Sequence, residues 1–199
     1  MSGTTAVESH PDPRIDVGVP PGKMGVWWFL ASEIMVFGGL IASYILYRMA
    51  AAGAWTENAA HVSTLIGAIN TVVLLTSSLT MILAFAAIED GNRKRSQTYL
   101  LLTVLLGVAF LVFKFFEYSS EIGHGFTPVT SVFWSFYYLM TGLHGLHVLG
   151  GIVANSVLFI MAVRGTLWPR HDRIEFAGLY WHFVDIVWIF LFPLLYLSY

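Results

Sequence analysis

Residues 179–192 read LYWHFVDIVWIFLF, an apolar segment that nevertheless contains His182 and Asp185 three positions apart. Together with its apolar neighbours on either side, this segment is long enough to cross a lipid bilayer as a helix. Ionisable side chains are costly in hydrocarbon, so they usually face the interior of a helix bundle or a wet cavity. Three roles therefore need to be weighed for the pair: ligands of a haem or metal, carriers of protons, or polar links between helices.

The composition of the whole chain supports a membrane setting. Of the 199 residues, 57% are hydrophobic and only 11% are charged, and the mean hydropathy is +0.71. A soluble domain has about 25% charged residues and could not bury so much apolar surface. The chain has no cysteine, which excludes disulfides, thiolate metal sites and cysteine nucleophiles. No basic patch indicates binding to nucleic acid, and no catalytic triad, phosphate loop or zinc signature is present.

Long apolar runs predict an all-α integral membrane protein with five transmembrane helices. The predicted spans are residues 24–47, 65–88, 99–116, 133–163 and 176–197. They form a single membrane domain over residues 24–199, which follows a polar, proline-containing tail at residues 1–23. We expect this tail to be disordered. The fourth run would be about 45 Å long, so we expect one long helix that tilts or protrudes from the bilayer.

The basic residues predict the orientation of the chain. With the N-terminus inside, the outer segments carry only Arg48 and Lys114 of the ten basic residues. The positive-inside rule then gives a cytoplasmic N-terminus and a periplasmic C-terminus. We interpret Lys114 and Glu117, at the outer end of the third span, as an interfacial pair whose charged ends reach the headgroup region.

Few other ionisable residues remain inside the predicted spans. They are Glu33, His144, His147, His182 and Asp185. Glu33 and Asp185 each lie about 14 Å into a helix that rises from the inner face, and His147 lies near the centre of the fourth span. We therefore expect a buried polar cluster that joins the first, fourth and fifth spans.

Three interpretations of this cluster remain open on the residues alone. A carboxylate and an imidazole could satisfy each other and link helices, or they could relay protons. No ladder of acids reaches both membrane faces, which weighs against a relay. The third interpretation is a haem or metal site, since His144 and His147 share a helix face and His182 could complete the set. The small residues around the histidine pair instead favour close helix packing; they are Gly142, Gly145, Gly150 and Gly151.

Other polar positions predict helix packing and surface contacts. The segment NTVVLLTSSLT at residues 70–80 predicts a stripe that contacts neighbouring helices, as do the spacings of Gly38 with Ala42 and of Gly39 with Ser43. Basic residues beside a tryptophan in the predicted inner loops are candidates for phospholipid headgroup contact, or they only set the topology. The candidates are Arg164, Trp168, Arg170 and Arg173.

Three motifs carry a resemblance to a known family. They are FLASEIMVFGGLIASY at 29–44, GLHGLHVLGG at 142–151 and YWHFVDIVWIFLFPLLY at 180–196. In this order and spacing they closely resemble subunit III of the haem–copper respiratory oxidases, most of all the bacterial five-span form of the cytochrome c oxidase type. The likeness runs from about residue 24 to the C-terminus. Many members have two further N-terminal spans around a lipid-filled cleft, so the lipids of that cleft are not carried over.

The resemblance implies a function for the chain as part of a complex. It implies a non-redox accessory subunit of a proton-pumping terminal oxidase of aerobic respiration, in the bacterial cytoplasmic membrane. Haem and copper would lie in partner subunits, with no cofactor, metal or catalytic residue in this chain. The chain would pack on subunit I, belong with subunit II to the same complex, bind phospholipid, and support proton uptake from the inner face.

The resemblance also implies roles for single residues. Glu33, in the family's SE motif, would be the carboxyl that reacts with hydrophobic carbodiimide. His144 and His147 match the paired histidines of the family, His182 and Asp185 match its last-helix motif, and Arg164 lies near a lipid-binding arginine. Subunit III of a quinol oxidase and a homologue associated with nitric oxide reductase remain alternatives. A stand-alone haem-binding membrane protein and an independent carrier or channel are alternatives of different classes.

Overall fold

The structure is a computed structural model of the chain, and it describes residues 21–51, 54–168 and 172–197. The helices in these ranges are α1 (Pro21–Ala50), α2 (Ala54–Ala59), α3 (Thr64–Glu89), α4 (Arg93–Gly123), α5 (Val132–Val163) and α6 (Asp172–Tyr196). Within the described ranges there is no strand, and five helices are long and apolar enough to cross a membrane. The predicted fold class is confirmed. The predicted tail lies outside the described residues except for its last three, which form the start of α1.

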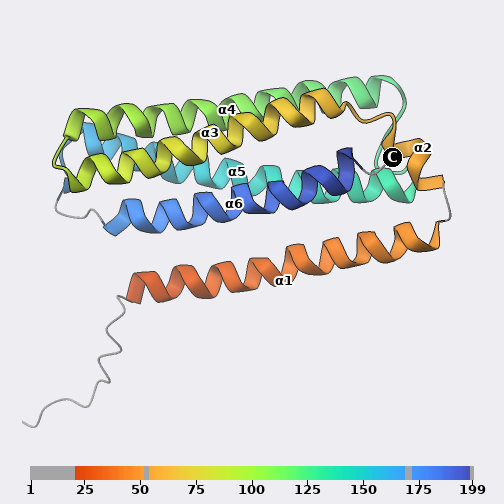
Figure 1. The fold of residues 1–199 in the computed structure, drawn as a ribbon, viewed down its shortest axis with the longest axis horizontal. Coiled ribbons are helices and arrows are strands. Elements are labelled where there is room, and N and C mark those ends of the chain that lie inside the picture. Colours follow the sequence, from red (N-terminus) through yellow and green to blue (C-terminus); the bar gives the residue numbers. More distant parts are fainter. Residues whose placement is uncertain (1–20, 52–53, 169–171, 198–199) are drawn as a thin grey trace, which may run out of the picture.

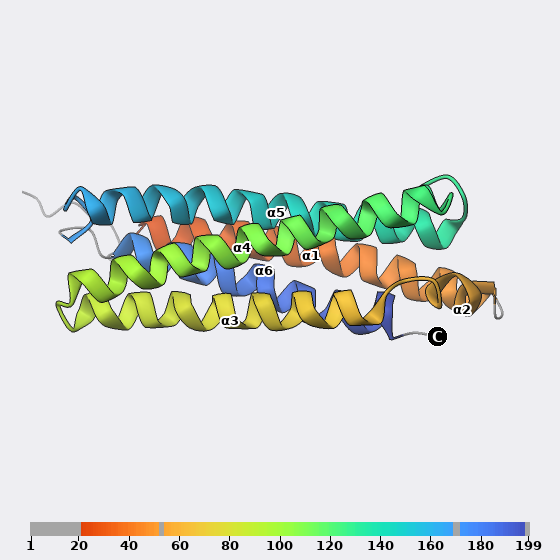
Figure 2. The same ribbon diagram turned by 90° about the horizontal axis from the view of Figure 1, so that it is seen from above.

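The long helices alternate in direction, so their ends gather at two poles of the molecule (Figures 1 and 2). The start of α1, the turn between α3 and α4, the end of α5 and the start of α6 lie at one pole. The short helix α2 and the end of α6 lie at the other pole. Most basic residues of the described ranges therefore lie near one end of the bundle, which is the arrangement that the orientation prediction requires; they are Lys23, Arg93, Lys94, Arg95, Arg164 and Arg173. The orientation itself stays a prediction.

Local signals set where the helices begin and end. Ser63, Asn92 and Ser131 precede α3, α4 and α5, and each side-chain oxygen accepts a hydrogen bond from a backbone N–H in the first turn. Gly91 has a φ of 70° in the tight turn between α3 and α4, a conformation that favours glycine. As predicted, the fourth span is one continuous helix, α5. Helix α4 extends beyond the predicted 99–116 at both ends.

Glycines allow tryptophan and tyrosine rings of α6 to approach neighbouring helices closely. A Cβ on Gly151 would lie 2.4 Å from the Trp181 ring, and one on Gly67 would lie 2.6 Å from the Tyr196 ring. The predicted packing role is confirmed at Gly151. An added Cβ would make only ordinary van der Waals contact at the other three predicted positions, so the described neighbours do not require glycine there. It would lie 3.8 Å from Tyr118 Oη at Gly142, 4.0 Å from Leu111 Cδ2 at Gly145 and 3.4 Å from Tyr180 Oη at Gly150.

Most hydroxyls of the α3 stripe contact α4 or α6, which confirms the predicted role in part; Thr76 is exposed and donates to the Val72 carbonyl of its own helix. The Trp181 Nε1 donates to Ser77 Oγ at 2.8 Å, and the Trp188 Nε1 donates to Thr71 Oγ1 at 3.0 Å. Thr80 and Thr103 share a hydroxyl–hydroxyl hydrogen bond of 2.8 Å in the interior. The hydroxyls therefore give the tryptophan N–H groups partners at a depth where water is scarce.

Candidate functional site

Glu33 of α1 and His147 of α5 form a direct pair. Glu33 Oε2 lies 3.0 Å from His147 Nε2, and His147 Nδ1 lies 2.8 Å from the carbonyl oxygen of Leu143. A carbonyl oxygen can only accept, so Nδ1 carries a proton. The contact between Nε2 and the carboxyl then holds one further proton, which sits on either partner. The geometry confirms the expected mutual satisfaction of a carboxyl and an imidazole.

Two further contacts tie α1 to α6 at other depths. Lys23 Nζ lies 2.5 Å from Glu175 Oε1, and Tyr44 Oη donates to the Leu194 carbonyl at 2.7 Å. The Lys23–Glu175 pair lies toward one end of α1, the Glu33–His147 pair lies near its middle, and Tyr44 lies toward the other end. Polar contacts thus attach α1 along its length.

His182 and Asp185 do not pair with each other. His182 Nδ1 lies 2.6 Å from Ser78 Oγ of α3. Asp185 is buried and lies near the same Ser78, but its two carboxylate oxygens make no hydrogen bond of ordinary geometry with the described residues. Both residues nevertheless face α3, so the last helix presents its polar face to the bundle.

His144 is buried within an aromatic environment. Its ring lies 5.1 Å from the Trp188 ring and 5.5 Å from the Phe110 ring, measured between centroids. Neither ring nitrogen has a hydrogen-bond partner among the described residues. His144 and His147 thus have different neighbours, although they lie three residues apart.

The expected single cluster is therefore divided into separate contacts. Of its five residues, only Glu33 and His147 share a hydrogen bond within the described ranges. Equal depth does not bring side chains together, because the rotation of each helix decides which neighbour a side chain faces. No three His, Asp or Glu residues in the described part of the chain are grouped so as to hold a metal ion.

Lys114 and Glu117 of α4 form a buried ion pair and not the interfacial pair that the sequence predicts. Lys114 Nζ lies 3.0 Å from Glu117 Oε2, and the two residues are only 6% and 1% exposed. The interpretation of this pair as interfacial is wrong. Lys114 also donates to the hydroxyls of Tyr137 at 3.2 Å and Tyr196 at 2.7 Å, and Tyr137 donates to Glu117 Oε1 at 2.8 Å. These hydrogen bonds connect α4, α5 and α6.

The surroundings of Lys114 explain why a charge is tolerated there. Its ammonium group lies 4.8 Å from the Tyr118 ring centroid and 4.9 Å from that of Tyr137. Aromatic faces attract cations, and the carboxylate supplies the opposite charge. The usable sequence signal was the i, i+3 spacing of Lys114 and Glu117, which places both on one face of a helix. Tyr137 and Tyr196 gave no such signal, because they are distant in sequence.

The candidate headgroup residues lie near the connection between α5 and α6. Arg164 follows the last turn of α5, and the Arg173 Nη1 lies 3.7 Å from Met161 Sδ. Arg170 lies outside the described residues. The guanidinium of Arg93 stacks 5.0 Å above the Trp168 ring centroid, beside a cavity of about 460 Å³. The structure therefore places Arg93, which comes from the other predicted inner loop, against Trp168.

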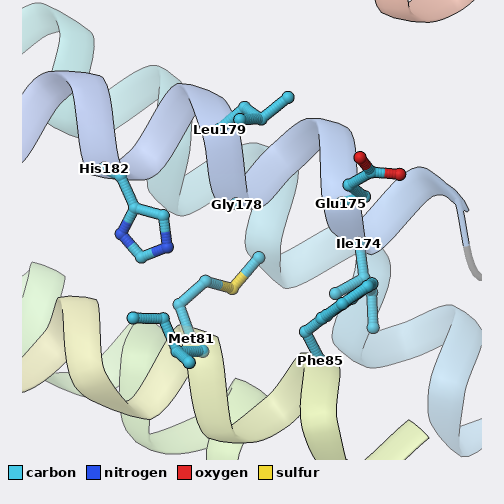
Figure 3. Close-up of a pocket in the computed structure, with 8 residues that line it drawn as sticks. Met81, Phe85, Ile174, Glu175, Gly178, Leu179 and His182 are labelled. Atoms are coloured by element: carbon cyan, nitrogen blue, oxygen red, sulfur yellow. The ribbon is translucent and has the colours of Figure 1, made fainter. Parts of the chain in front are cut away.

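A small apolar pocket lies between α3 and α6 (Figure 3). Its volume is about 150 Å³, and Met81, Phe85 and Ile174 line it. Figure 3 shows His182 and Glu175 toward opposite ends of the labelled residues. The Ser78 contact holds the His182 ring at this pocket.

The fold and its polar contacts define a class of protein. Within the described ranges, five helices can cross a membrane, and several of their ionisable groups bind side chains of other helices. These properties are those of a multi-pass helical membrane protein.

The chain belongs to the cytochrome c oxidase subunit III family, whose model, described as "Cytochrome c oxidase subunit III", matches residues 8–198. The cytochrome c oxidase subunit 3 of Alkalihalophilus pseudofirmus is 38% identical over 191 residues, which cover 95% of this chain and 92% of that protein. The protein of the same description from Corynebacterium diphtheriae is 35% identical over 177 residues, which cover 87% of this chain and 86% of that protein. The chain is therefore subunit III of a haem–copper cytochrome c oxidase, which is an oxidoreductase complex. The resemblance seen in the sequence motifs is confirmed.

A longer relative has a different organisation. The "Heme-copper oxidase subunit I+III" of Aeropyrum pernix is 31% identical over 198 residues, which cover 96% of this chain but 24% of that protein. Most of that polypeptide therefore lies outside the region similar to this chain.

Proposed function

We propose that this subunit is a non-redox accessory part of a proton-pumping terminal oxidase, which stabilises the catalytic subunit and supports proton uptake from the inner face. The observation that carries the proposal is that several of its membrane-depth ionisable groups bind side chains of other helices. Glu33 binds His147, Lys114 binds Glu117 and two tyrosines, and His182 binds Ser78. Groups engaged in this way stabilise a bundle.

The partners and the location follow from the same proposal. Subunit I is the main partner, and the relative that unites subunits I and III in its description supports this assignment. Subunit II, with haem and copper carried outside this chain, completes the complex. The chain lies in the bacterial cytoplasmic membrane with its N-terminus inside, and phospholipid headgroups are bound by Arg164, Trp168, Arg170 and Arg173.

Purification in mild detergent with a tag on this chain tests the proposal. We expect the tagged chain to co-elute with haem and copper at a constant ratio, in a complex that oxidises cytochrome c. The chain freed from its partners should show no Soret band. Elution of the chain alone from several mild detergents, or a stoichiometric Soret band in the isolated chain, would contradict the proposal.

The reactivity of Glu33 gives a separate prediction. The Glu33 side chain is 16% exposed and belongs to α1, the helix at the edge of the bundle, whereas Asp185 is only 3% exposed. A hydrophobic carbodiimide that enters from lipid should therefore reach Glu33 and not Asp185. We expect Glu33→Gln to abolish labelling of this subunit and to leave the haem spectrum of the complex unchanged. Asp185→Asn is the matched control and should label like the wild type. Persistent labelling of Glu33→Gln would refute the assignment.

A further inference from the structure

A pocket opens at the pole of the bundle that carries α2 and the end of α6, which we call the α2 pole. Its volume is about 490 Å³, and its walls come from the connection between α2 and α3 and from the end of α4. His61 and His124 are exposed members of the lining. The pocket therefore joins the end of α4 to the aqueous phase at this pole. Its lining residues are His61, Ser63, Ser120, Glu121, His124 and Phe126.

Glu121 is the buried acid of this pocket. The residue is only 6% exposed, yet its carboxylate makes no hydrogen bond or ion pair within the described ranges. Its backbone carbonyl accepts from the N–H groups of His124 and Phe126, which fixes the chain around the pocket. The Tyr138 hydroxyl donates to the Phe126 carbonyl at 2.8 Å and so does not serve Glu121. A buried carboxylate normally has a partner, so the position of Glu121 indicates a ligand that enters through the pocket.

The charge around Glu121 is unbalanced. Glu117 lies about one helical turn before Glu121 and is bound to Lys114, whose Nζ is 3.0 Å from Glu117 Oε2. Lys114 therefore faces two carboxyl groups with a single positive charge. His61 and His124 are exposed, so water screens any charge that they carry. The titratable neighbours of the two carboxyls are Lys114 and Tyr118 of α4, Tyr137 and Tyr138 of α5, Tyr196 of α6, and His61 and His124 at the pocket.

A proton fits this deficit better than a metal ion does. No three His, Asp or Glu residues around the pocket, or elsewhere in the described part of the chain, are grouped so as to hold a metal. Glu117 and Glu121 are four residues apart on one helix, a spacing that brings their Cβ atoms to about 5–6 Å. Two carboxyls at such a distance can share one proton, because like charges disfavour the state in which both are ionised.

Aromatic rings close the arrangement toward the middle of the bundle. One turn inward from Lys114 on α4 is Phe110, whose ring lies 4.9 Å from the Trp188 ring between centroids. The Lys114 ammonium lies 5.6 Å from the same Trp188 ring. Among the described residues, no side-chain hydrogen bond links Lys114, Glu117 and their tyrosines to Glu33 or to His182. Protons that enter from the α2 pole thus have no continuous path to the other pole.

We propose that Glu117 and Glu121 form a proton-binding site that exchanges with the aqueous phase at the α2 pole alone. A proton from water in the pocket forms an O–H bond with the Glu121 carboxylate and is shared with Glu117, one turn away. The pair then carries one negative charge, which the Lys114 ammonium balances. His61 and His124 lie at the pocket, and imidazole exchanges protons near neutral pH. That this phase is the outer one rests on the proposed function, whereas the proton site itself does not.

Infrared spectroscopy of the intact oxidase complex tests the site. An ordinary exposed carboxyl is ionised throughout the range from about pH 6 to about pH 9. In the difference spectrum between these limits, we expect a protonated-carboxyl band that shifts in D2O and is lost in Glu121→Gln. Glu89→Gln, which removes an exposed carboxyl at the opposite pole, is the matched control and should keep the band. A difference spectrum of Glu121→Gln identical to that of the wild type would overturn the inference. A band that appears only after treatment with EDTA would do the same, because a metal ion would then occupy the site.

Glu117→Gln tests whether the proton is shared. Lys114 would balance the one remaining carboxylate, so we expect the band to be lost as in Glu121→Gln. Glu121→Asp, which keeps both carboxyls, should retain it. A full band in Glu117→Gln would refute a shared site. Because the Glu121 side chain makes no hydrogen bond within the described ranges, Glu121→Gln should assemble normally and decides the question even where Glu117→Gln does not assemble.

The side from which the proton comes is tested in sealed vesicles that contain the complex. Val129 is 92% exposed on the connection between α4 and α5 at the α2 pole, and the chain has no cysteine. A membrane-impermeant maleimide on Val129→Cys therefore shows which phase this pole faces. We expect the band to respond to the pH of that phase and not to the pH of the other. A response to the opposite phase would overturn the inference. Labelling from the inner phase would instead refute the proposed orientation, and failure to co-elute with haem would refute the proposed function.

Discussion

Replacement of Lys114 by Met is expected to lower the free energy of unfolding by about 3–5 kcal/mol, because it leaves the Glu117 carboxylate buried without its counter-charge. The change also removes the donor to the Tyr196 hydroxyl, which fixes the end of α6. The measurement is unfolding of the purified subunit in mixed micelles with increasing SDS, followed by tryptophan fluorescence.

The double variant Lys114→Met with Glu117→Gln separates loss of the pair from loss of packing. It removes both charges, so we expect it to recover more than half of the stability lost in the single variant. Conversely, if Lys114→Met changed the stability by less than about 0.5 kcal/mol, the pair would be acting as an exposed one.

The second large effect is expected from Gly151→Ala, which adds one methyl group. The new Cβ would lie 2.4 Å from the Trp181 ring, which is fully buried and bonded through its Nε1 to Ser77. Neither the ring nor the backbone of α5 has room to yield, so we expect a loss of about 2 kcal/mol or more. The same SDS titration measures it.

Gly145→Ala is the matched control on the same helix. Its Cβ would meet only Leu111, at 4.0 Å. Alanine is a better helix former than glycine by about 1 kcal/mol, so this variant should be as stable as the wild type or slightly more stable. If the two variants behaved alike, the close approach of α6 at Gly151 would not be a determinant of stability.

The sequence predicted the number of spans because long apolar runs are a strong and local signal. It also predicted that a carboxyl and an imidazole inside the spans satisfy each other, which Glu33 and His147 do, but it did not say which two residues would pair. It did not predict the partners of His182 and Asp185. Depth follows from position along a helix, but the azimuth of a side chain depends on how the helices rotate and pack.

The ends of α4 were misjudged for a related reason. The third predicted span ends at residue 116, beside Lys114 and Glu117, since charged residues commonly mark the end of a span. The structure continues α4 to Gly123, because the two charges neutralise each other beside Tyr137 and Tyr196. These tyrosines lie on α5 and α6, so no window of local sequence contains the whole arrangement.

The three polar contacts of α1 also constrain the order in which the protein can be completed during synthesis. Their partners lie far along the chain: Glu175 is 152 residues after Lys23, Leu194 is 150 after Tyr44, and His147 is 114 after Glu33. Helix α1 is made before α6, and two of these three partners arrive only with α6. Helix α1 must therefore wait in the membrane, without these contacts of Lys23 and Tyr44, until α6 is inserted. A chain whose synthesis stopped before α6 would leave α1 without two of its three polar contacts.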